Sequence, residues 1–210
     1  AFGDFSRTVD ALGRAEKLED TFAGAGRFDI TLSPFNLGVN LAAGFNQPWR
    51  VGATVAGSLL GFDLWGEYGA VLPVVSYDYS WAASVGLGRS FGQDKEWDLR
   101  TEVFFNGRGQ EDAELTAKSS FAPYYLGKYY LYVAGSKQKL FAPGSSLSLS
   151  WLGNLSDLSW TAAAGLGLAL PALIPLNITV RYNGGPDKRE FTLRNGGPAW
   201  SLQVQTVLQL

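Results

Sequence analysis

The chain contains the stretch Trp200-Ser-Leu-Gln-Val-Gln-Thr-Val-Leu-Gln-Leu210, in which two kinds of side chain alternate. The even positions are apolar or neutral, whereas the odd positions are mostly amides and a hydroxyl. Successive side chains of a β-strand point to opposite sides of the sheet. The stretch therefore predicts a strand with one apolar and one polar face, which is typical of a strand between lipid and an aqueous lumen.

The same alternation recurs in other parts of the chain. In Trp97–Phe105 the odd positions are apolar or neutral, and the even positions are polar or charged apart from Phe104. Similar patterns occupy Leu147–Leu155, Leu176–Asn183 and Arg27–Leu32. Strands of soluble sandwiches alternate too, but such long and frequent repetition is rare among them. The repetition predicts an all-β protein with an apolar outer surface.

Turn signals such as Ser33-Pro34 and Asn183-Gly-Gly-Pro186 divide the chain into about twelve predicted strands. They lie near 27–33, 36–45, 49–59, 62–72, 77–91, 96–106, 124–136, 145–156, 158–170, 176–183, 190–194 and 199–210. Bacterial outer-membrane barrels have an even number of antiparallel strands. The predicted fold is a transmembrane antiparallel up-and-down β-barrel of about 12 strands, within a range of roughly 8–14.

The composition agrees with a membrane barrel. Charged residues make up 17% of the 210 residues and aromatic residues 14%, whereas soluble proteins have roughly 25% charged residues. No run of about 18 apolar residues is present, so the sequence predicts no membrane-spanning helix. A closed barrel is then the remaining way to pair every backbone group across a bilayer.

Several classes of function are excluded by residue types that the chain lacks. It has no Cys and no His, so a disulfide, a thiolate metal site and a Ser-His-Asp triad are impossible. Asp98 and Glu102 would lie about 13 Å apart on one strand face, too far for a glycosidase pair. The net charge of −2 does not favour nucleic acid. We predict no enzyme activity, no cofactor and no metal.

Two segments differ from the predicted strands. Residues 1–26 are charged and lack alternation, and Phe5, Val9 and Leu12 follow a helical spacing. We predict a short helical N-terminal segment that is either a surface tether or a plug in the lumen, followed by a barrel domain over 27–210. Residues 107–123 form the longest predicted loop, and long loops lie outside the cell in such barrels.

Aromatic and charged residues fall on opposite predicted faces. Trp and Tyr near the strand ends, such as Trp81, Tyr125 and Trp160, predict girdles at the membrane surfaces. Charged residues on the inward face either pair structurally or select the solutes that pass. The predicted pore-lining residues are Arg50, Asp63, Glu67, Asp98, Arg100, Glu102, Lys128 and Arg181. Small inward residues on 77–91 and 158–170 leave space for water or for another segment.

Three motifs resemble porin-like outer-membrane barrels of Gram-negative bacteria over roughly residues 49–170. They are Trp97-Asp-Leu-Arg-Thr-Glu-Val-Phe-Phe-Asn-Gly-Arg-Gly109, Tyr124-Tyr-Leu-Gly-Lys-Tyr-Tyr130 and Leu147-Ser-Leu-Ser-Trp-Leu-Gly-Asn-Leu-Ser-Asp157. The resemblance implies a membrane location and a channel-like body, and it implies no particular substrate.

The function predicted from the sequence is a passive, porin-like channel for ions or small polar solutes in the bacterial outer membrane. The alternative is a structural or complex-forming barrel that holds a partner in its lumen or presents loops such as 107–123. The predicted partners are the lipid bilayer, together with other outer-membrane proteins or further copies of the chain.

Overall fold

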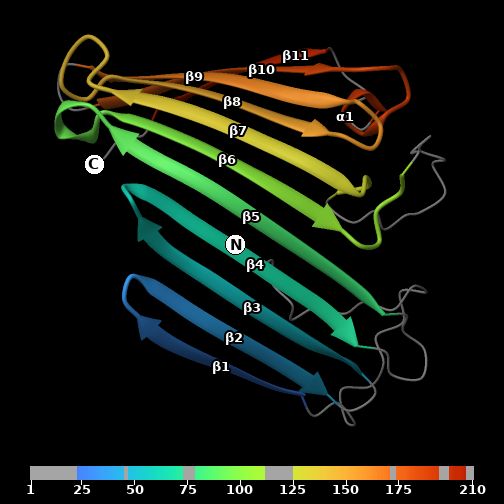
Figure 1. Ribbon diagram of the computed structural model, residues 1–210. Helices are drawn as coiled ribbons and strands as arrows, with labels where there is room; N and C mark the ends of the chain where they lie inside the picture. The colour runs from blue at the N-terminus through green and yellow to red at the C-terminus, as the bar shows by residue number, and fades with distance from the viewer. Residues whose placement is uncertain are drawn as a thin grey trace.

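The computed structural model describes residues 23–44, 47–72, 79–111, 125–170, 174–193 and 199–206. These residues form one antiparallel up-and-down sheet of eleven strands, each paired with the next along the chain (Figure 1). The strands are β1 (Ala23–Leu32), β2 (Phe35–Gly44), β3 (Gln47–Leu59), β4 (Phe62–Leu72), β5 (Ser80–Phe91), β6 (Trp97–Asn106), β7 (Tyr129–Gln138), β8 (Ser146–Asn154), β9 (Trp160–Leu170), β10 (Ile174–Gly184) and β11 (Trp200–Thr206). The predicted all-β, antiparallel up-and-down architecture is confirmed.

Most strand boundaries lie within a few residues of those predicted, and β4 matches its predicted range of 62–72. β1 begins at Ala23 rather than at Arg27, so residues 23–26 belong to the sheet and not to an N-terminal segment. β7 begins at Tyr129 rather than at 124. The predicted helix within residues 1–22 and most of the predicted loop 107–123 lie outside the described residues.

The strand predicted at 190–194 is wrong, because Glu190–Leu193 form a short helix, α1. Two backbone amides at its start donate to side chains of the distant β8–β9 connection. The Glu190 amide donates to the Asp157 carboxylate at 2.9 Å, and the Phe191 amide donates to the Ser159 hydroxyl at 3.2 Å. These acceptors satisfy helix-end donors that otherwise have no partner, so α1 replaces an extended segment and the sheet has eleven strands.

The strand register places most apolar side chains on one face of the sheet and most polar side chains on the other. Directly opposed residues of neighbouring strands share a face. Opposed pairs on one face include Phe28–Val39, Val85–Val103 and Val180–Leu202. Opposed pairs on the other face include Arg27–Asn40, Thr54–Glu67 and Ser136–Ser148. We call these the apolar face and the polar face.

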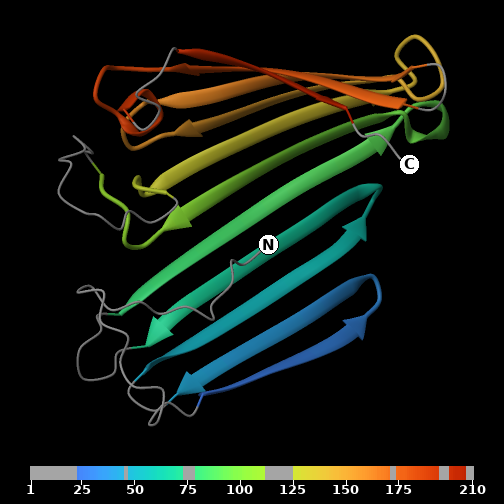
Figure 2. The same ribbon diagram turned by 180° about the vertical axis from the view of Figure 1, so that it is seen from behind.

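The sheet is curved, and its two edge strands lie apart (Figures 1 and 2). In the described part of the chain, β1 pairs only with β2 and β11 pairs only with β10. Because all eleven strands alternate in direction, β1 and β11 run the same way. The four connections β1–β2, β3–β4, β5–β6 and β7–β8 define the turn end, and the opposite end, with the β6–β7 connection, is the loop end.

The described residues contain almost no apolar core. Apart from Pro48 and several glycines, only Ala70 and Tyr130 among these residues are apolar and buried, with 6% and 1% of their surface exposed. By contrast, side chains of the apolar face are widely exposed, including Val85 at 68% and Leu202 at 56%. No described helix is long and apolar enough to span a membrane.

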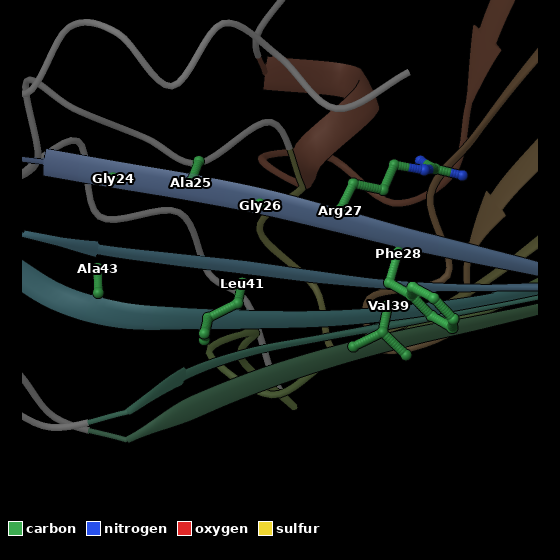
Figure 3. A pocket seen from close by; sticks show the side chains of 8 residues that line it. All are labelled: Gly24, Ala25, Gly26, Arg27, Phe28, Val39, Leu41 and Ala43. Atoms are coloured by element: carbon green, nitrogen blue, oxygen red, sulfur yellow. The ribbon is translucent and has the colours of Figure 1, made fainter.

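The edge of the apolar face carries a shallow hollow of about 420 Å³ over β1 and β2. Figure 3 shows Phe28, Val39 and Leu41 on one side of the sheet and Arg27 on the other. Gly24 and Gly26 lie on the apolar side without a side chain, and open space surrounds both positions. The hollow is therefore a shallow depression in a continuous apolar surface, and no polar side chain lines it on that face.

Candidate functional site

The polar face is the candidate site, and its charge is unevenly distributed among the strands. On β7 to β11 the described inward residues are mostly Ser, Thr, Asn, Gln, Ala and Gly, and Arg181 is the one charged side chain among them. Most inward acidic residues instead lie on β4 and β6, namely Asp63, Glu67, Asp98 and Glu102, and Asp29 lies on β1.

Charged pairs lie at the β1 edge and on β6. The Arg27 Nε atom lies 2.7 Å from an Asp29 carboxylate oxygen, and both side chains are more than half exposed. On β6, Arg100 Nε lies 2.7 Å from Asp98 Oδ1, and the Ser90 hydroxyl donates to Asp98 Oδ2 at 2.9 Å. The predicted alignment of Asp98, Arg100 and Glu102 along one strand face is present, and its first two members form an ion pair.

Glu102 is held by a tryptophan from two strands away. The Trp65 indole N–H donates to Glu102 Oε2 at 2.9 Å. A Cβ atom at Gly86 would overlap the Trp65 ring, so the ring lies flat across β5. This places an aromatic surface on the polar face and turns the Glu102 carboxylate toward β4.

The remaining predicted site residues lie in three different places. Arg50 and Glu67 are on the polar face of β3 and β4, and the Asp63 carboxylate accepts a hydrogen bond from the Ser58 hydroxyl at 2.6 Å. Arg181 lies on the polar face of β10. Lys128 precedes β7, and its Nζ atom lies 2.5 Å from Glu111 Oε1 at the loop end. Lys128 is therefore a residue of the β6–β7 connection and not of the wall.

The Lys128–Glu111 ion pair shifts the titration of both groups. The lysine hydrogen bond and charge lower the pKa of Glu111, and the glutamate hydrogen bond and charge raise the pKa of Lys128. Next to this pair, the Gln110 amide donates to the Leu126 carbonyl at 2.9 Å. The ion pair therefore links the segment after β6 to the segment before β7 while both groups are charged.

A buried polar cluster at the loop end was not predicted from the sequence. Glu190 of α1 is 1% exposed, as are Tyr130 and Asn154. The Glu190 carboxylate accepts from the Tyr130 hydroxyl at 2.5 Å, from Asn154 Nδ2 at 2.9 Å and from the Leu126 amide at 3.2 Å. Buried carboxylates require such donors, so this cluster fastens α1 to the ends of β7 and β8.

α1 lies over a hollow in the polar face of about 380 Å³. Residues of β7 to β10 and of α1 line it, including Tyr132, Ser150, Thr161, Arg181, Asn183 and Phe191. The Thr161 hydroxyl is shielded from solvent and has no hydrogen-bond partner among the described residues. The sequence signal for this hollow was the small-residue pattern of 158–170, which predicted space but not its position.

The loop end of the apolar face carries a band of aromatic rings. Ring centroids lie 6.1 Å apart for Tyr68–Trp81, 4.2 Å for Trp81–Phe105 and 5.4 Å for Phe105–Tyr129. Trp160 and Tyr182 continue the band at 5.5 Å. At the turn end, the Arg89 and Lys137 cations lie over Phe62 and Trp97, at 4.8 and 4.6 Å from the ring centroids.

Tyr125, which we expected in a girdle, belongs to the other face. Its ring packs on Phe104 at 5.3 Å and on Tyr130 at 4.8 Å, both from the polar face. Burial and the Glu190 charge raise the pKa of Tyr125. Tyr125 therefore covers the buried cluster below α1.

The described residues hold no group of three or more His, Cys, Asp or Glu side chains suited to a metal ion. No protein-family model matches the chain, and no curated protein matches it at a significant level.

Proposed function

We propose that the curved sheet closes into a β-barrel in a bacterial outer membrane and serves as a passive channel for ions and small polar solutes. The observation that carries this proposal is the separation of a mainly apolar face from a mainly polar face over all eleven described strands. The apolar face would contact lipid, and the polar face would line the lumen.

The exposure of the apolar side chains supports a lipid environment. Soluble monomers rarely expose contiguous apolar surface beyond a few hundred Å², yet here the exposed apolar side chains extend from β1 to β11. The single hydroxyl on the apolar face of β6, Thr101, donates to the Tyr132 carbonyl at 3.2 Å. Polar groups facing hydrocarbon need such an internal partner.

The aromatic band and the basic residues at opposite ends support the same environment. Trp and Tyr favour the level of the lipid headgroups, because the ring is apolar and the N–H or O–H group stays hydrated. Arg89 and Lys137 lie at the turn end, where long basic side chains reach the aqueous boundary. The apolar residues between these two ends form the belt that would meet the acyl chains.

The width of the sheet and the small inward residues support an open lumen. Barrels of about 8 strands are filled by their own side chains, whereas 16–18 strands leave a wide aqueous channel. Eleven strands lie between these limits. Gly165 and Gly167 on β9 lie beside Ser148 and Ser146, so this stretch of wall has no large side chains.

Conductance in planar lipid bilayers tests the channel. We expect discrete current steps from the purified chain, and no steps from lipid and detergent alone. Liposome swelling in small polar solutes provides a second measurement that does not depend on ion selectivity. Folded protein that inserts into vesicles without current or swelling would contradict the channel and favour a barrel that holds a partner.

A further inference from the structure

We propose that the hollow under α1 binds small hydroxylated carboxylates, a class that includes sugar acids. This inference rests on the proposed channel, because it names the solutes that the lumen would recognise. The proposed site has a floor of β8, β9 and β10, a side at Tyr132 of β7, and a cover formed by Phe191 of α1.

Arg181 supplies the charge that the ligand requires. Its register partners are Ala163 on β9 and Ser201 on β11, so small side chains flank it on both sides. Among the described residues, no carboxylate forms an ion pair with Arg181. A guanidinium presents a planar set of donors that matches a carboxylate with two parallel hydrogen bonds.

Two acidic side chains, one lining the hollow and one opposite its Tyr132 side, are already held by other donors. Glu190 lines the hollow, but its carboxylate oxygens accept from Tyr130, Asn154 and the Leu126 amide. Glu102 stands opposite Tyr132 across the β6–β7 pair, but its Oε2 atom accepts from Trp65. Arg181 therefore shares the hollow with one carboxylate, Glu190, whose oxygens already accept from other donors.

Hydroxyl and amide groups surround the Arg181 guanidinium and would form hydrogen bonds with the hydroxyl groups of the ligand. Thr161 and Asn183 are directly opposed on β9 and β10, and Ser150 and Tyr132 come from β8 and β7. The Thr161 hydroxyl lacks a partner although solvent does not reach it, and buried polar groups are normally satisfied. A ligand hydroxyl would complete its hydrogen bonding.

The size of the hollow fits a small molecule. Its volume of about 380 Å³ lies near the lower end of small-molecule sites, which span roughly 300–1,000 Å³. Leu152, Ala163 and Phe191 add apolar surface beside these polar groups. This combination suits a compact polyhydroxy acid better than a long or apolar solute.

Equilibrium dialysis with detergent-solubilised full-length protein tests the site. The probes are gluconate, its uncharged relative glucose, and acetate, which has the charge without the hydroxyls. We expect gluconate to bind at least about tenfold more tightly than either, because the charge and the hydroxyls are both used. Equal binding of gluconate and glucose, or of gluconate and acetate, would overturn the proposal.

Matched variants locate the binding. Arg181→Gln is expected to weaken gluconate binding by at least about tenfold, whereas Arg89→Gln removes the same charge from the apolar face and leaves binding unchanged. Thr161→Val keeps the side-chain shape and is expected to weaken binding several-fold, so it tests the site even if Arg181→Gln fails to fold. Equal effects of Arg181→Gln and Arg89→Gln, or no effect of Thr161→Val, would overturn the assignment.

Conductance measured on the same samples separates the two proposals. Gluconate binding without current would reject the channel and leave the site. Current without gluconate binding would reject the site and leave the channel.

Discussion

Thr101 shows what the apolar face demands of a single residue. Its neighbours on that face are Leu87 and Val133, and its hydroxyl bonds to a backbone carbonyl. A polar side chain that has no such hydrogen-bond partner within the protein should be tolerated only on the polar face. Positions 179 and 180 offer a direct comparison, because these consecutive residues of β10 lie on opposite faces of the sheet.

Val180→Arg should reduce the free energy of unfolding by about 2–4 kcal/mol if the position lies near the middle of the bilayer. Val180 is 45% exposed on the apolar face, opposite Leu202. Thr179→Arg, on the polar face opposite Gln203, should cost much less because water reaches it. Urea titrations in lipid vesicles measure both variants. Equal losses at the two positions would reject the lipid-facing assignment.

At the scale of elements, α1 depends on contacts that a local sequence pattern does not contain. Phe191 and Leu193 alternate with polar residues, and this period of two predicted a strand. The pattern covers only five residues, and the acceptors for the α1 amides lie more than thirty positions earlier, at Asp157 and Ser159. The hollow and the buried cluster escaped prediction for the same reason, because α1 completes both.

Asp157→Ala should release the first turn of α1. The buried Asp157 carboxylate accepts from the Glu190 amide, the Ser159 amide and the Ser159 hydroxyl. Removing an acceptor from buried donors costs about 1–3 kcal/mol. Urea titration and amide hydrogen exchange at Glu190 measure the loss. Asp187→Ala, at an exposed position in the same connection, is the control, and an equal effect there would contradict the capping role.

The β6–β7 connection should respond to acid through the Lys128–Glu111 pair. The pKa of Glu111 is lowered in the folded protein, so its contribution is present above the unfolded pKa and is lost as pH falls through the folded one. Glu111→Gln should therefore speed exchange of the Gln110 amide at pH 7 relative to the unsubstituted chain. The difference should vanish in acid, when Glu111 is protonated in both cases. A difference that persists in acid would assign the effect to packing.

At the scale of the whole molecule, the strand order and the separation of the faces followed from the sequence because alternation and turn residues act locally. β4 matched its predicted range since it follows Leu60 and Gly61, both with positive φ, in a two-residue turn. Whether the edges meet is a different matter. β1 and β11 are separated by the entire sheet, and no local pattern specifies their contact.

The proposed barrel requires the β1 and β11 edges to come together, because unpaired backbone groups are costly in lipid. The chain has no Cys, so Phe28→Cys with Leu202→Cys supplies its only thiols. A flexible bis-maleimide should link these two within one chain after insertion into vesicles. Phe28→Cys with Val103→Cys, which joins an edge to the middle of the sheet, should not be linked. A product of twice the chain mass would instead show that edges of two chains meet.

The pairing of each strand with its sequence neighbour has a consequence for assembly. The alignment of a strand depends on the one before it, and the few distant contacts include the Tyr130–Glu190 hydrogen bond across 60 positions. Such low contact order favours rapid, stepwise zippering. It also lets an error spread, because a slip of one residue in any hairpin exchanges the faces of every later strand. In the proposed barrel, a slipped chain would present its polar residues to hydrocarbon. Insertion into the bilayer would thus select for the correct strand alignment. Misaligned intermediates would be unstable in lipid and would leave the membrane before the last strands form.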